Sequence, residues 1–333
     1  MELRGIEFPP ALGASGVQGF FGDPRHPEYK HSLIIKALFG DIFEGMGFVA
    51  KTATSYPNKG NVQLSAKDGF SFEELSPKAI HVMPFKKAAL NAVGLSNEGY
   101  EFLLNTGIWQ ERLDPFMLSF MPIGSTSEVR KTETERFVLF LKKELPNFNS
   151  EIALQVNLSC PNTGHAQQML LDEANVFFEI LGELNIPLVP KINAVLPINV
   201  ASKLMDHPLV DALCVSNTIP FGEFAHKIDW RKYSEKNGKS PLEKYGYPAG
   251  GLSGKPIFPI VVEWLKEFHM RRILNKNSKP IIAGGGVMTR KNVRALAQFK
   301  GVEAISIGSV GFLRPWRVPG IIWECHERLA QKD

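Results

Sequence analysis

The sequence predicts an α/β protein built as a closed (β/α)8 TIM barrel. Short apolar segments alternate about eight times with segments of helical apolar spacing, and this alternation is typical of a parallel sheet covered by helices. The chain has 333 residues, a length that such barrels reach as one domain. Because no shorter repeat and no second composition interrupts the alternation, we expect a single domain over residues 1–333.

The first half of the chain supplies the first part of this alternation. Residues 11–16 form a short apolar strand that runs into small residues, and residues 31–43 have helical apolar spacing. Residues 48–52 read as a buried strand ending at Lys51. Residues 54–91 are irregular, with Pro57 and Gly60 as breakers and a hairpin expected around 70–83. The apolar segments 115–121 and 152–158 are expected strands, and the amphipathic segments 98–108 and 127–145 are expected helices.

The second half continues the alternation to the end of the chain. Apolar side chains recur at i, i+4, i+7 and i+8 in residues 167–184, which marks a helix with a stripe facing the core. By the same patterns we expect strands at 187–192, 212–216, 280–283 and 304–307 and helices at 197–206, 257–273, 289–298 and 318–330. Residues 219–249 have no such pattern, and so long an irregular segment is usually functional. We therefore expect a lid or a partner-binding insertion there.

Composition excludes several classes of protein. The net charge of +4 is spread along the chain without a basic block, which argues against nucleic-acid binding. The three cysteines are far apart and odd in number, so they indicate neither disulfides nor a metal site. No apolar run approaches the roughly 18 residues that span a bilayer, and no signal segment begins the chain. We expect a cytoplasmic protein without a membrane span or a bound metal.

The stretch 154–163 carries the most distinctive chemistry. It begins as an apolar strand and breaks at Pro161, with Asn157 and Asn162 on either side of Cys160. Amides both donate and accept hydrogen bonds, which suits a ring that carries C=O and N–H groups. The alternative is a strand that ends in a polar turn with a buried cysteine. For this motif alone, the two interpretations stand about even.

Three glycine-rich turns lie near the end of the chain, at residues 250–254, 284–286 and 308–309. Bare backbone N–H groups in such turns bind anions, and barrels often hold a phosphate after strands 7 and 8. The alternative is that these glycines only permit tight turns.

Lys51 and Lys191 both end expected buried strands. A lysine in such a place is costly unless it contacts an anion or an electron-rich ring. One alternative is an aldolase that uses Lys191 as a Schiff-base lysine. That function assigns no role to Asn157, Asn162, Asn217 and Cys160.

The ordered set of motifs resembles the dihydroorotate dehydrogenase family. Asn-Leu-Ser-Cys-Pro-Asn at 157–162, Lys191, Ser-Asn-Thr at 216–218, Gly-Gly-Leu-Ser-Gly at 250–254 and Ala-Gly-Gly-Gly-Val at 283–287 occur in that family's order. Upstream, Ala-Ser-Gly at 14–16, Lys-Thr at 51–52 and the segment 91–97 are similar to its early motifs. The resemblance covers roughly residues 11–312, and the ordered set is far more specific than any single motif.

The resemblance implies an FMN-binding barrel that oxidises dihydroorotate to orotate. It places Cys160 as the catalytic base that takes the C5 proton while hydride leaves C6 for flavin N5, with Lys191 and Lys51 also catalytic. The pyrimidine would contact Lys51, Asn91, Gly94, Leu95, Asn157, Asn162, Asn217 and Thr218. The flavin would contact Ala14, Ser15, Lys51, Thr52, Asn157, Lys191, Ser216, Ser253, Gly254, Gly285, Gly286, Gly308 and Ser309. Lys51 would pair with the substrate carboxylate.

The cysteine base and the short segment before the first strand are similar to the soluble branch of the family. The sequence has no cysteine cluster for iron–sulfur centres and no GxGxxG fingerprint, so an NAD-linked acceptor would require another subunit. Fumarate and quinones also remain open as acceptors, and we expect a homodimer. The segments 19–47 and 217–250 are longer than the family pattern, and Val93 and Ser96 replace the Met and Pro of some members. A relative acting on uracil-type dihydropyrimidines and a non-catalytic FMN-binding barrel are the remaining alternatives.

Overall fold

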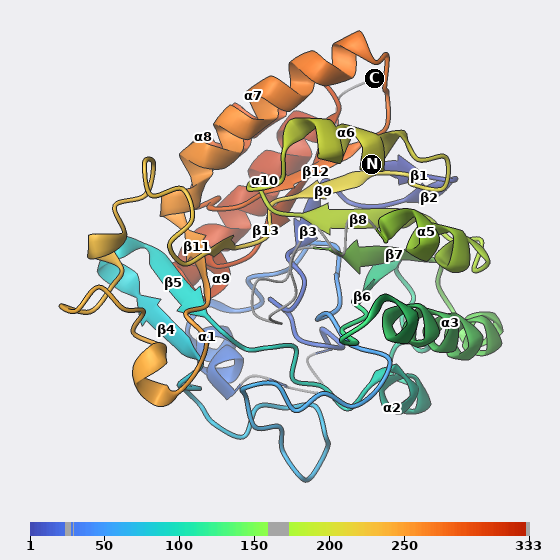
Figure 1. The fold of residues 1–333 in the computed structure, drawn as a ribbon, viewed down its shortest axis with the longest axis horizontal. Helices are drawn as coiled ribbons and strands as arrows, with labels where there is room; N and C mark the ends of the chain where they lie inside the picture. The colour runs from blue at the N-terminus through green and yellow to red at the C-terminus, as the bar shows by residue number, and fades with distance from the viewer. Residues whose placement is uncertain (24–27, 29, 159–172, 331–333) are drawn as a thin grey trace.

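The chain folds around a curled parallel sheet, as the alternation predicted (Figure 1). The computed structural model describes residues 1–23, 28, 30–158 and 173–330. Seven strands are hydrogen-bonded in the order β3-β13-β12-β9-β8-β7-β6, and all neighbours are parallel. They are β3 (Ala11–Gly13), β6 (Phe116–Phe120), β7 (Ile152–Asn157), β8 (Leu188–Ile192), β9 (Leu213–Val215), β12 (Ile281–Gly284) and β13 (Val302–Ile307).

The segment 47–53 closes this sheet into a barrel. It forms isolated parallel bridges with both edge strands, at Leu12↔Gly47, Val49↔Met117 and Ala53↔Phe120. The predicted strand at 48–52 is therefore present as bridges without a continuous ladder. One reason is that the Lys51 N–H donates to the Gly19 carbonyl, at 2.8 Å, and not to a neighbouring strand. The closed (β/α)8 barrel predicted from the sequence is confirmed.

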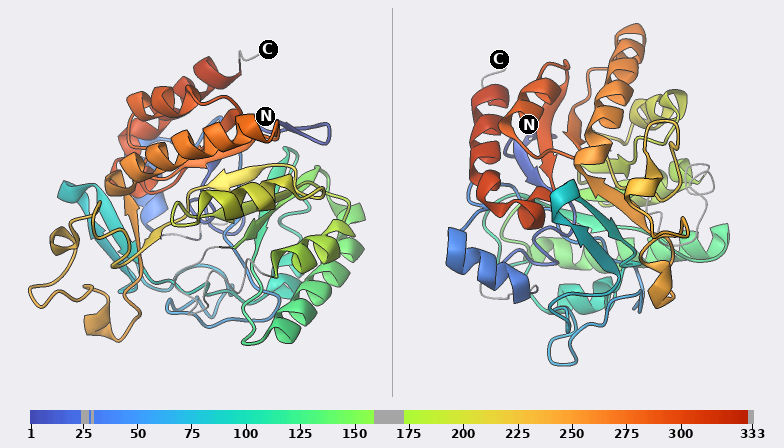
Figure 2. Two further views of the ribbon diagram at one scale, coloured as in Figure 1. Left: turned by 45° about the horizontal axis from the view of Figure 1, so that its top comes forward. Right: turned by 90° about the vertical axis from the view of Figure 1, so that its left-hand side faces the viewer.

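Helices cover the outside of the barrel (Figure 2). They are α2 (Tyr100–Asn105), α3 (Ser127–Glu144), α5 (Ala174–Gly182), α6 (Ile198–Asp206), α7 (Phe258–Leu274), α8 (Arg290–Ala297), the short α9 (Val310–Leu313) and α10 (Val318–Leu329). The side chains of Thr126 and Thr289 cap α3 and α8 by accepting the N–H of Val129 and Asn292. Apart from α9, which was not predicted, these helices match the predicted ones, although α2 covers only the middle of the segment 98–108. Helix α5 begins at Ala174, and residues 167–172 lie outside the described part.

Helix α1 (Lys30–Phe39) confirms the helical spacing at 31–43 as far as Phe39. Ile35 packs partly against the core, but most of the other described apolar side chains of α1 are exposed. Leu33, Ile34 and Leu38 are 50%, 52% and 69% exposed, and Phe39 contacts the ring of Trp316. The pattern that predicted a helix therefore did not predict a core-facing helix, because α1 lies beside the barrel, next to the 315–317 turn (Figure 2).

The N-terminal residues close the bottom of the barrel. Strands β1 (Glu2–Leu3) and β2 (Ile6–Glu7) form an antiparallel hairpin. Its buried side chains belong to one apolar cluster inside the barrel. The members of this cluster are Leu3, Ile6, Phe8, Leu12, Val49, Met117, Ala153, Val189, Ala212, Cys214, Ile282 and Ala304. The opposite end, where the parallel strands finish, is left for the site.

A second, antiparallel sheet lies at that other end, with the order β10-β11-β5-β4. Its strands are β4 (Ile80–Met83), β5 (Ala88–Asn91), β10 (Ile219–Pro220) and β11 (Gly251–Gly254). The hairpin expected at 70–83 was placed wrongly: it joins β4 to β5 through the turn at Pro84–Lys86. Residues Gly251–Gly254 form a strand and not a turn, because they make a continuous ladder with β5. Gly254 must be a glycine there, since a Cβ would lie 2.3 Å from the Lys87 carbonyl oxygen.

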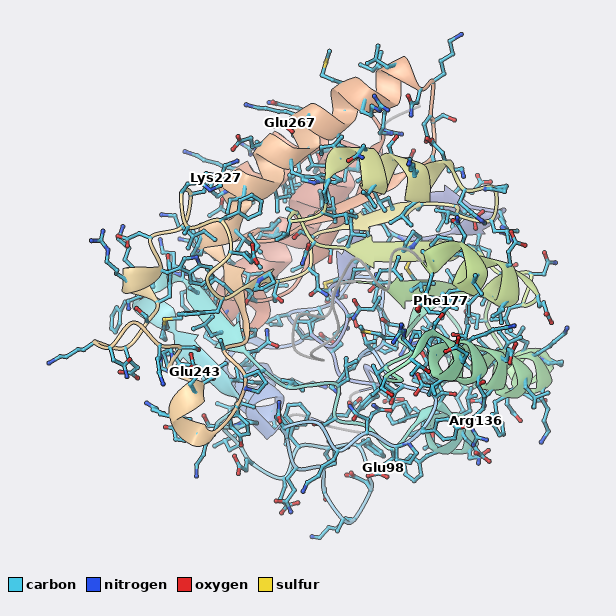
Figure 3. The ribbon with its side chains drawn as sticks, viewed as in Figure 1. Glu98, Arg136, Phe177, Lys227, Glu243 and Glu267 are labelled. Carbon is cyan, nitrogen blue, oxygen red and sulfur yellow. The ribbon has the colours of Figure 1, made fainter. Side chains whose placement is uncertain are left out.

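The segment 219–249 is mostly irregular, with short 3-10 turns at Trp230–Lys232 and Glu243–Tyr245. Lys227 forms an ion pair with Glu263 of α7 at 2.9 Å, and Leu242 is fully buried. Lys227 and Glu243 are marked on this segment in Figure 3. Among the described residues, the helices are all too short or too polar to cross a membrane.

Candidate active site

The ends of neighbouring parallel strands bring the central site residues together. Asn157, the last residue of β7, pairs in register with Lys191 of β8, which in turn pairs with Cys214 of β9. Asn157 is 4% exposed and Lys191 is 6% exposed. Because parallel strands all finish at the same end of the barrel, residues from distant parts of the chain converge there.

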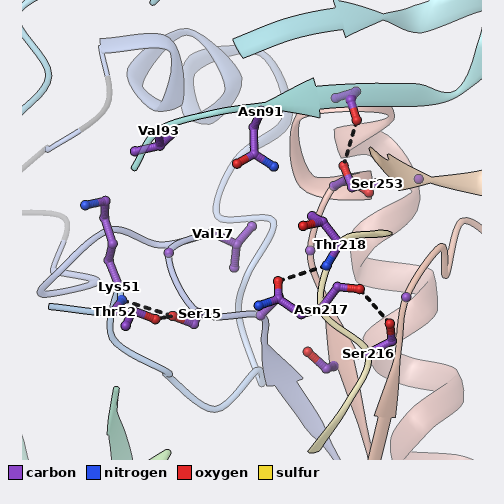
Figure 4. A pocket seen from close by; sticks show the side chains of 18 of the residues that line it. Ser15, Val17, Lys51, Thr52, Asn91, Val93, Ser216, Asn217, Thr218 and Ser253 are labelled. Atoms are coloured by element: carbon purple, nitrogen blue, oxygen red, sulfur yellow. Dashed lines mark hydrogen bonds between the residues drawn. The ribbon is translucent and has the colours of Figure 1, made fainter. Parts of the chain in front are cut away.

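One pocket collects every described residue that the resemblance assigned. Its lining includes Ala14, Ser15, Lys51, Thr52, Asn91, Gly94, Leu95, Asn157, Lys191, Ser216, Asn217, Thr218, Ser253, Gly254, Gly285, Gly286, Gly308 and Ser309. Figure 4 shows Lys51 and Asn217 on opposite sides of this pocket, with Asn91 above them. Cys160 and Asn162 lie outside the described residues.

A chain of hydrogen bonds orients the polar side chains on the pocket floor. Asn217 Nδ2 donates to Asn157 Oδ1 at 3.3 Å, and Asn157 Nδ2 donates to Thr52 Oγ1 at 3.2 Å. The hydroxyls of Thr52 and Ser15 lie 2.8 Å apart (Figure 4). Asn217 Oδ1 also accepts the Thr218 N–H at 2.9 Å. Fixed amide orientations are what recognition of a flat ring with both donors and acceptors requires.

Lys51 provides a positive charge at one side of the pocket. Its side chain is buried, with 7% exposure, and its Nζ donates to the Ser96 carbonyl at 2.5 Å. Nζ also lies 4.3 Å from the centre of the Phe20 ring. A ring face and a carbonyl oxygen both stabilise a buried cation.

The loop 91–97 is held by asparagines that the sequence analysis did not identify. Asn58 Nδ2 donates to the carbonyls of Gly94 and Leu95, at 2.7 and 2.9 Å, and Asn61 Nδ2 donates to Ala92 at 2.7 Å. Leu95 has a left-handed backbone, with φ of 58°. Such a conformation is unfavourable for leucine and requires support from its surroundings. No local pattern marks these asparagines, because the bonds span more than 30 positions.

The glycine turns at the other end of the pocket leave the backbone uncovered. Gly285 and Gly286 have φ of 91° and 77°, and a Cβ on Gly286 would lie 2.5 Å from the Gly254 carbonyl oxygen. Gly308 is different, since a Cβ there would meet only Ala14, at 3.0 Å. Backbone N–H groups in such turns suit a phosphate.

The pocket also has an apolar wall that the motifs did not predict. It includes Val17, Phe72, Ile80, Ala89, Val93, Ile257, Val287 and Phe312. Phe72 comes from the irregular segment before β4 and Ile80 begins β4, and only their distant contacts place them here. A mostly apolar wall with a few oriented polar groups is typical of cofactor sites.

The two described cysteines are poor candidates for a catalytic base. Cys214 and Cys325 are buried. Burial raises the pKa of the Cys214 thiol to about 11 although Lys191 lowers it, and burial raises the pKa of Cys325 to about 12, with a contribution from Glu324. Both thiols are therefore protonated at neutral pH, which leaves Cys160 as the remaining cysteine.

Comparisons with known proteins agree with this site. Residues 45–329 match the family model described as dihydroorotate dehydrogenase. The catalytic subunit of dihydroorotate dehydrogenase B (NAD(+)) from Bacillus cereus is 27% identical over 334 residues, covering 97% of this chain and 89% of the relative. The same-named subunit from Anoxybacillus flavithermus is 29% identical over 243 residues, covering 71% of this chain and 69% of the relative.

A solved structure shows the same fold. Dihydroorotate dehydrogenase from Eimeria tenella in complex with ferulenol has a TM-score of 0.65 and 17% identity, covering 99% of this chain and 84% of that one. The ligand-free enzyme from the same organism gives a TM-score of 0.63 and 16% identity. Since the family model covers most of the sequence, the chain belongs to the dihydroorotate dehydrogenase family, flavoprotein oxidoreductases that convert dihydroorotate to orotate in pyrimidine biosynthesis.

Proposed function

We propose that this chain oxidises dihydroorotate with a non-covalently bound FMN and that Cys160 is the base that takes the C5 proton. The observation that carries the proposal is the convergence of all the described motif residues on one pocket. They come from segments scattered between residues 14 and 309. A shared binding site for one cofactor and one substrate explains why residues so far apart in the sequence line the same pocket.

The polar lining and the uncovered glycine backbone of the pocket suit FMN. When bound, FMN accepts the hydride that leaves C6 of the substrate. The uncovered backbone at Gly285, Gly286 and Gly308 would bind the phosphate. Ser253 and Ser309 would contact the ribityl phosphate region beside it. Lys191 would supply a fixed positive charge where the cofactor gains negative charge.

The substrate would lie against the amides and Lys51. Asn157 and Asn217 present oriented donors and acceptors to the pyrimidine, with Thr218 beside them. Lys51 and the backbone at Gly94 and Leu95 would hold the carboxylate. A thiolate at Cys160 would then remove the C5 proton, which is acidic because C5 lies α to a carbonyl. The roles of Asn91 and Asn162 on the substrate follow the same resemblance.

Buried Lys51 distinguishes this function from its alternatives. An enzyme for uracil-type dihydropyrimidines has no carboxylate to pair with a cation, and a non-catalytic FMN-binding barrel has no need to keep one buried. An aldolase using Lys191 would leave the bonded Asn217–Asn157–Thr52 series without a role.

The names of the relatives favour an electron acceptor outside this chain. They are catalytic subunits of an NAD(+)-dependent enzyme, and we propose that a separate subunit passes electrons from this chain to NAD. Fumarate and quinones are the competing acceptors. We further propose a cytoplasmic homodimer, in keeping with a biosynthetic enzyme whose cysteines need no oxidising compartment.

Anaerobic reduction of the purified protein tests the proposed function. The protein should be yellow. Dihydroorotate should bleach its flavin absorbance within seconds of mixing, and dihydrouracil should bleach it far more slowly. A colourless protein, or equal bleaching by both compounds, would overturn the assignment of FMN or of the carboxylate-bearing substrate, respectively.

A further inference from the structure

Asn58 is a polar side chain that supports the pocket from outside it. It lies outside the pocket lining and faces a hollow on the molecular surface, which it shares with Glu74 and Tyr247. Its backbone is paired with the far end of the loop 91–97. The Asn58 N–H donates to the Asn97 carbonyl at 2.8 Å, and the Asn58 carbonyl accepts the Asn97 N–H at 2.9 Å. This pairing places the Asn58 amide directly behind the loop.

The Asn58 amide donates to two consecutive carbonyls at the tip of that loop. Its Nδ2 lies 2.7 Å from the Gly94 oxygen and 2.9 Å from the Leu95 oxygen. Both residues have a left-handed backbone, with φ of 69° and 58°, which is unfavourable for leucine. Asn61 bonds the start of the loop, at the Ala92 carbonyl. Asn58 is therefore the side chain that supports the tip.

These two bonds also fix the directions of the N–H groups at the loop tip. A peptide unit is planar and trans, so its C=O and its N–H point in opposite directions. Because the Gly94 carbonyl points at Asn58, the N–H of Leu95 points away from it. The Leu95 carbonyl fixes the Ser96 N–H in the same way. Gly94 and Leu95 line the pocket, and successive N–H groups in a turn form a site for an anion.

We propose that Asn58 is a positioning residue for the substrate carboxylate: by holding two carbonyls on the outer side of the loop, it directs the N–H groups of Leu95 and Ser96 into the pocket. This inference rests on the proposed function, because it assumes that the ligand carries a carboxylate. It deepens that function by giving the anion site a support that touches no atom of the ligand. Without this amide, the two peptide units at the tip can turn over, and their N–H groups no longer converge.

The test compares orotate with uracil, which lacks the carboxylate, in the flavin-loaded wild type and in Asn58→Ala at pH 7. Titrations followed by the flavin absorbance give the dissociation constants. Orotate should bind roughly 5- to 100-fold more weakly to the variant, because two hydrogen bonds that orient its anion site are lost, whereas uracil should change much less. Orotate affinity equal to that of the wild type, or an equal loss for both ligands, would overturn the proposal.

Reduction by dihydroorotate separates positioning from chemistry. Since Asn58 touches no reacting atom, the concentration that gives half of the maximal bleaching rate should rise by about the same factor as the orotate dissociation constant. The rate at saturation should stay close to that of the wild type, as expected when only binding is weakened. A lower rate at saturation with an unchanged half-saturating concentration would contradict the positioning role.

Asn275→Ala is the matched control on the outside of the barrel. Asn275 also donates two hydrogen bonds through Nδ2, to Ser202 at 2.9 Å and to Asp206 at 3.1 Å. Its removal should lower the melting temperature without changing the ratio of orotate affinity to uracil affinity. A change in that ratio as large as in Asn58→Ala would show that the ratio reports general stability, and the proposal would fail.

A second variant covers the case in which Asn58→Ala loses its flavin. Asn58→Ser keeps one donor and should show the same selective loss of orotate affinity to a smaller extent. Loss of flavin in both variants would show a general structural role and would refute the proposal. Orotate binding by the wild type with no selective loss in the variants rejects the role of Asn58 alone. Neither orotate binding nor bleaching by dihydroorotate in the wild type would reject the proposed function.

Discussion

At the scale of single residues, the buried charge of Lys51 is the most specific feature of the pocket. Burying an ammonium group is costly, and contacts with the Ser96 carbonyl and the Phe20 ring offset part of that cost. Its end-of-strand position was predictable from the sequence. Its supports were not, since Phe20 and Ser96 are 31 and 45 positions away from Lys51 and no local pattern links them to it.

Replacing Lys51 should change ligand preference more than it changes the fold. Lys51→Ala should weaken orotate by about 2–5 kcal/mol, because a buried carboxylate would lose its charged partner. Uracil, which has no carboxylate, should lose much less. Flavin-monitored titrations of both ligands measure the difference. An equal loss for both would point to a defect in flavin binding or folding.

Removing the thiol of Cys160 should slow the chemical step and spare binding. A positioned base contributes about 10²–10⁴-fold, so Cys160→Ala should slow anaerobic bleaching by saturating dihydroorotate by that factor, with flavin content and orotate affinity nearly unchanged. Cys160→Ser should be intermediate at best, because a hydroxyl is far less acidic than a thiol. The wild-type rate should rise with pH as the thiol ionises, and the alanine variant should lose that dependence.

Cys214→Ala is the matched control for Cys160, since Cys214 is buried inside the barrel and its pKa is raised to about 11. It should bleach at nearly the wild-type rate after a modest loss of stability. Near-normal stopped-flow bleaching in Cys160→Ala would refute the catalytic role.

At the scale of elements, the glycine turns can be tested at Gly308, where an added Cβ would have one close neighbour, Ala14 Cβ at 3.0 Å. Gly308 has an ordinary φ, and an added Cβ would meet only Ala14. Gly308→Asp would place a carboxylate beside the proposed phosphate, and the purified variant should be colourless. Gly308→Ala adds the same Cβ without charge and should keep most of its flavin. Full flavin content in the aspartate variant would contradict the phosphate assignment.

The segment 219–249 has contacts with distant residues that its sequence pattern did not predict. Its ends are fixed, by the β10–β11 pairing and by the buried Leu242, whereas residues 235–239 are exposed. The sequence indicated a long functional loop, but the ion pair of Lys227 with Glu263 and the packing of Leu242 depend on distant partners. The hairpin β4–β5 was misplaced for the same reason, because β4 is identified by its ladder with β5 and not by alternation.

Limited proteolysis tests whether this segment moves. Trypsin should cut the free enzyme first at Lys236 or Lys239, in the exposed part, and saturating orotate should slow that cut if the segment acts as a lid. Mass spectrometry of the first fragments identifies the site. Initial cleavage elsewhere would reject the mobile-lid proposal, and a ligand-independent rate would favour a partner-binding surface.

At the scale of the whole molecule, the barrel was predictable because its signal is repeated. Each apolar strand and amphipathic helix supports the same fold. The wrong prediction of a continuous strand at 48–52, where isolated bridges replace a ladder, therefore did not change the predicted fold. The pocket was predictable in part because parallel strands force their ends together. What the sequence could not supply were supports from outside the strands, such as Asn58 and Asn61, whose partners lie more than 30 positions away and are set by the closed fold.

The choice of electron acceptor depends on the whole molecule. It can be tested by measuring which compounds reoxidise the flavin of the purified chain. Because the sequence has three scattered cysteines and no GxGxxG fingerprint, we expect neither an iron–sulfur cluster nor a nicotinamide site in this chain. After anaerobic reduction by dihydroorotate, the flavin should therefore be reoxidised by an artificial dye within seconds but remain reduced when NAD is added. Fumarate and a short-chain quinone are compared in the same stopped-flow experiment. Rapid reoxidation by NAD would contradict the need for a second subunit, and rapid reoxidation by fumarate or the quinone would identify that compound as the acceptor. Slow reoxidation by all three would support a separate electron-transfer subunit, as the names of the bacterial relatives suggest.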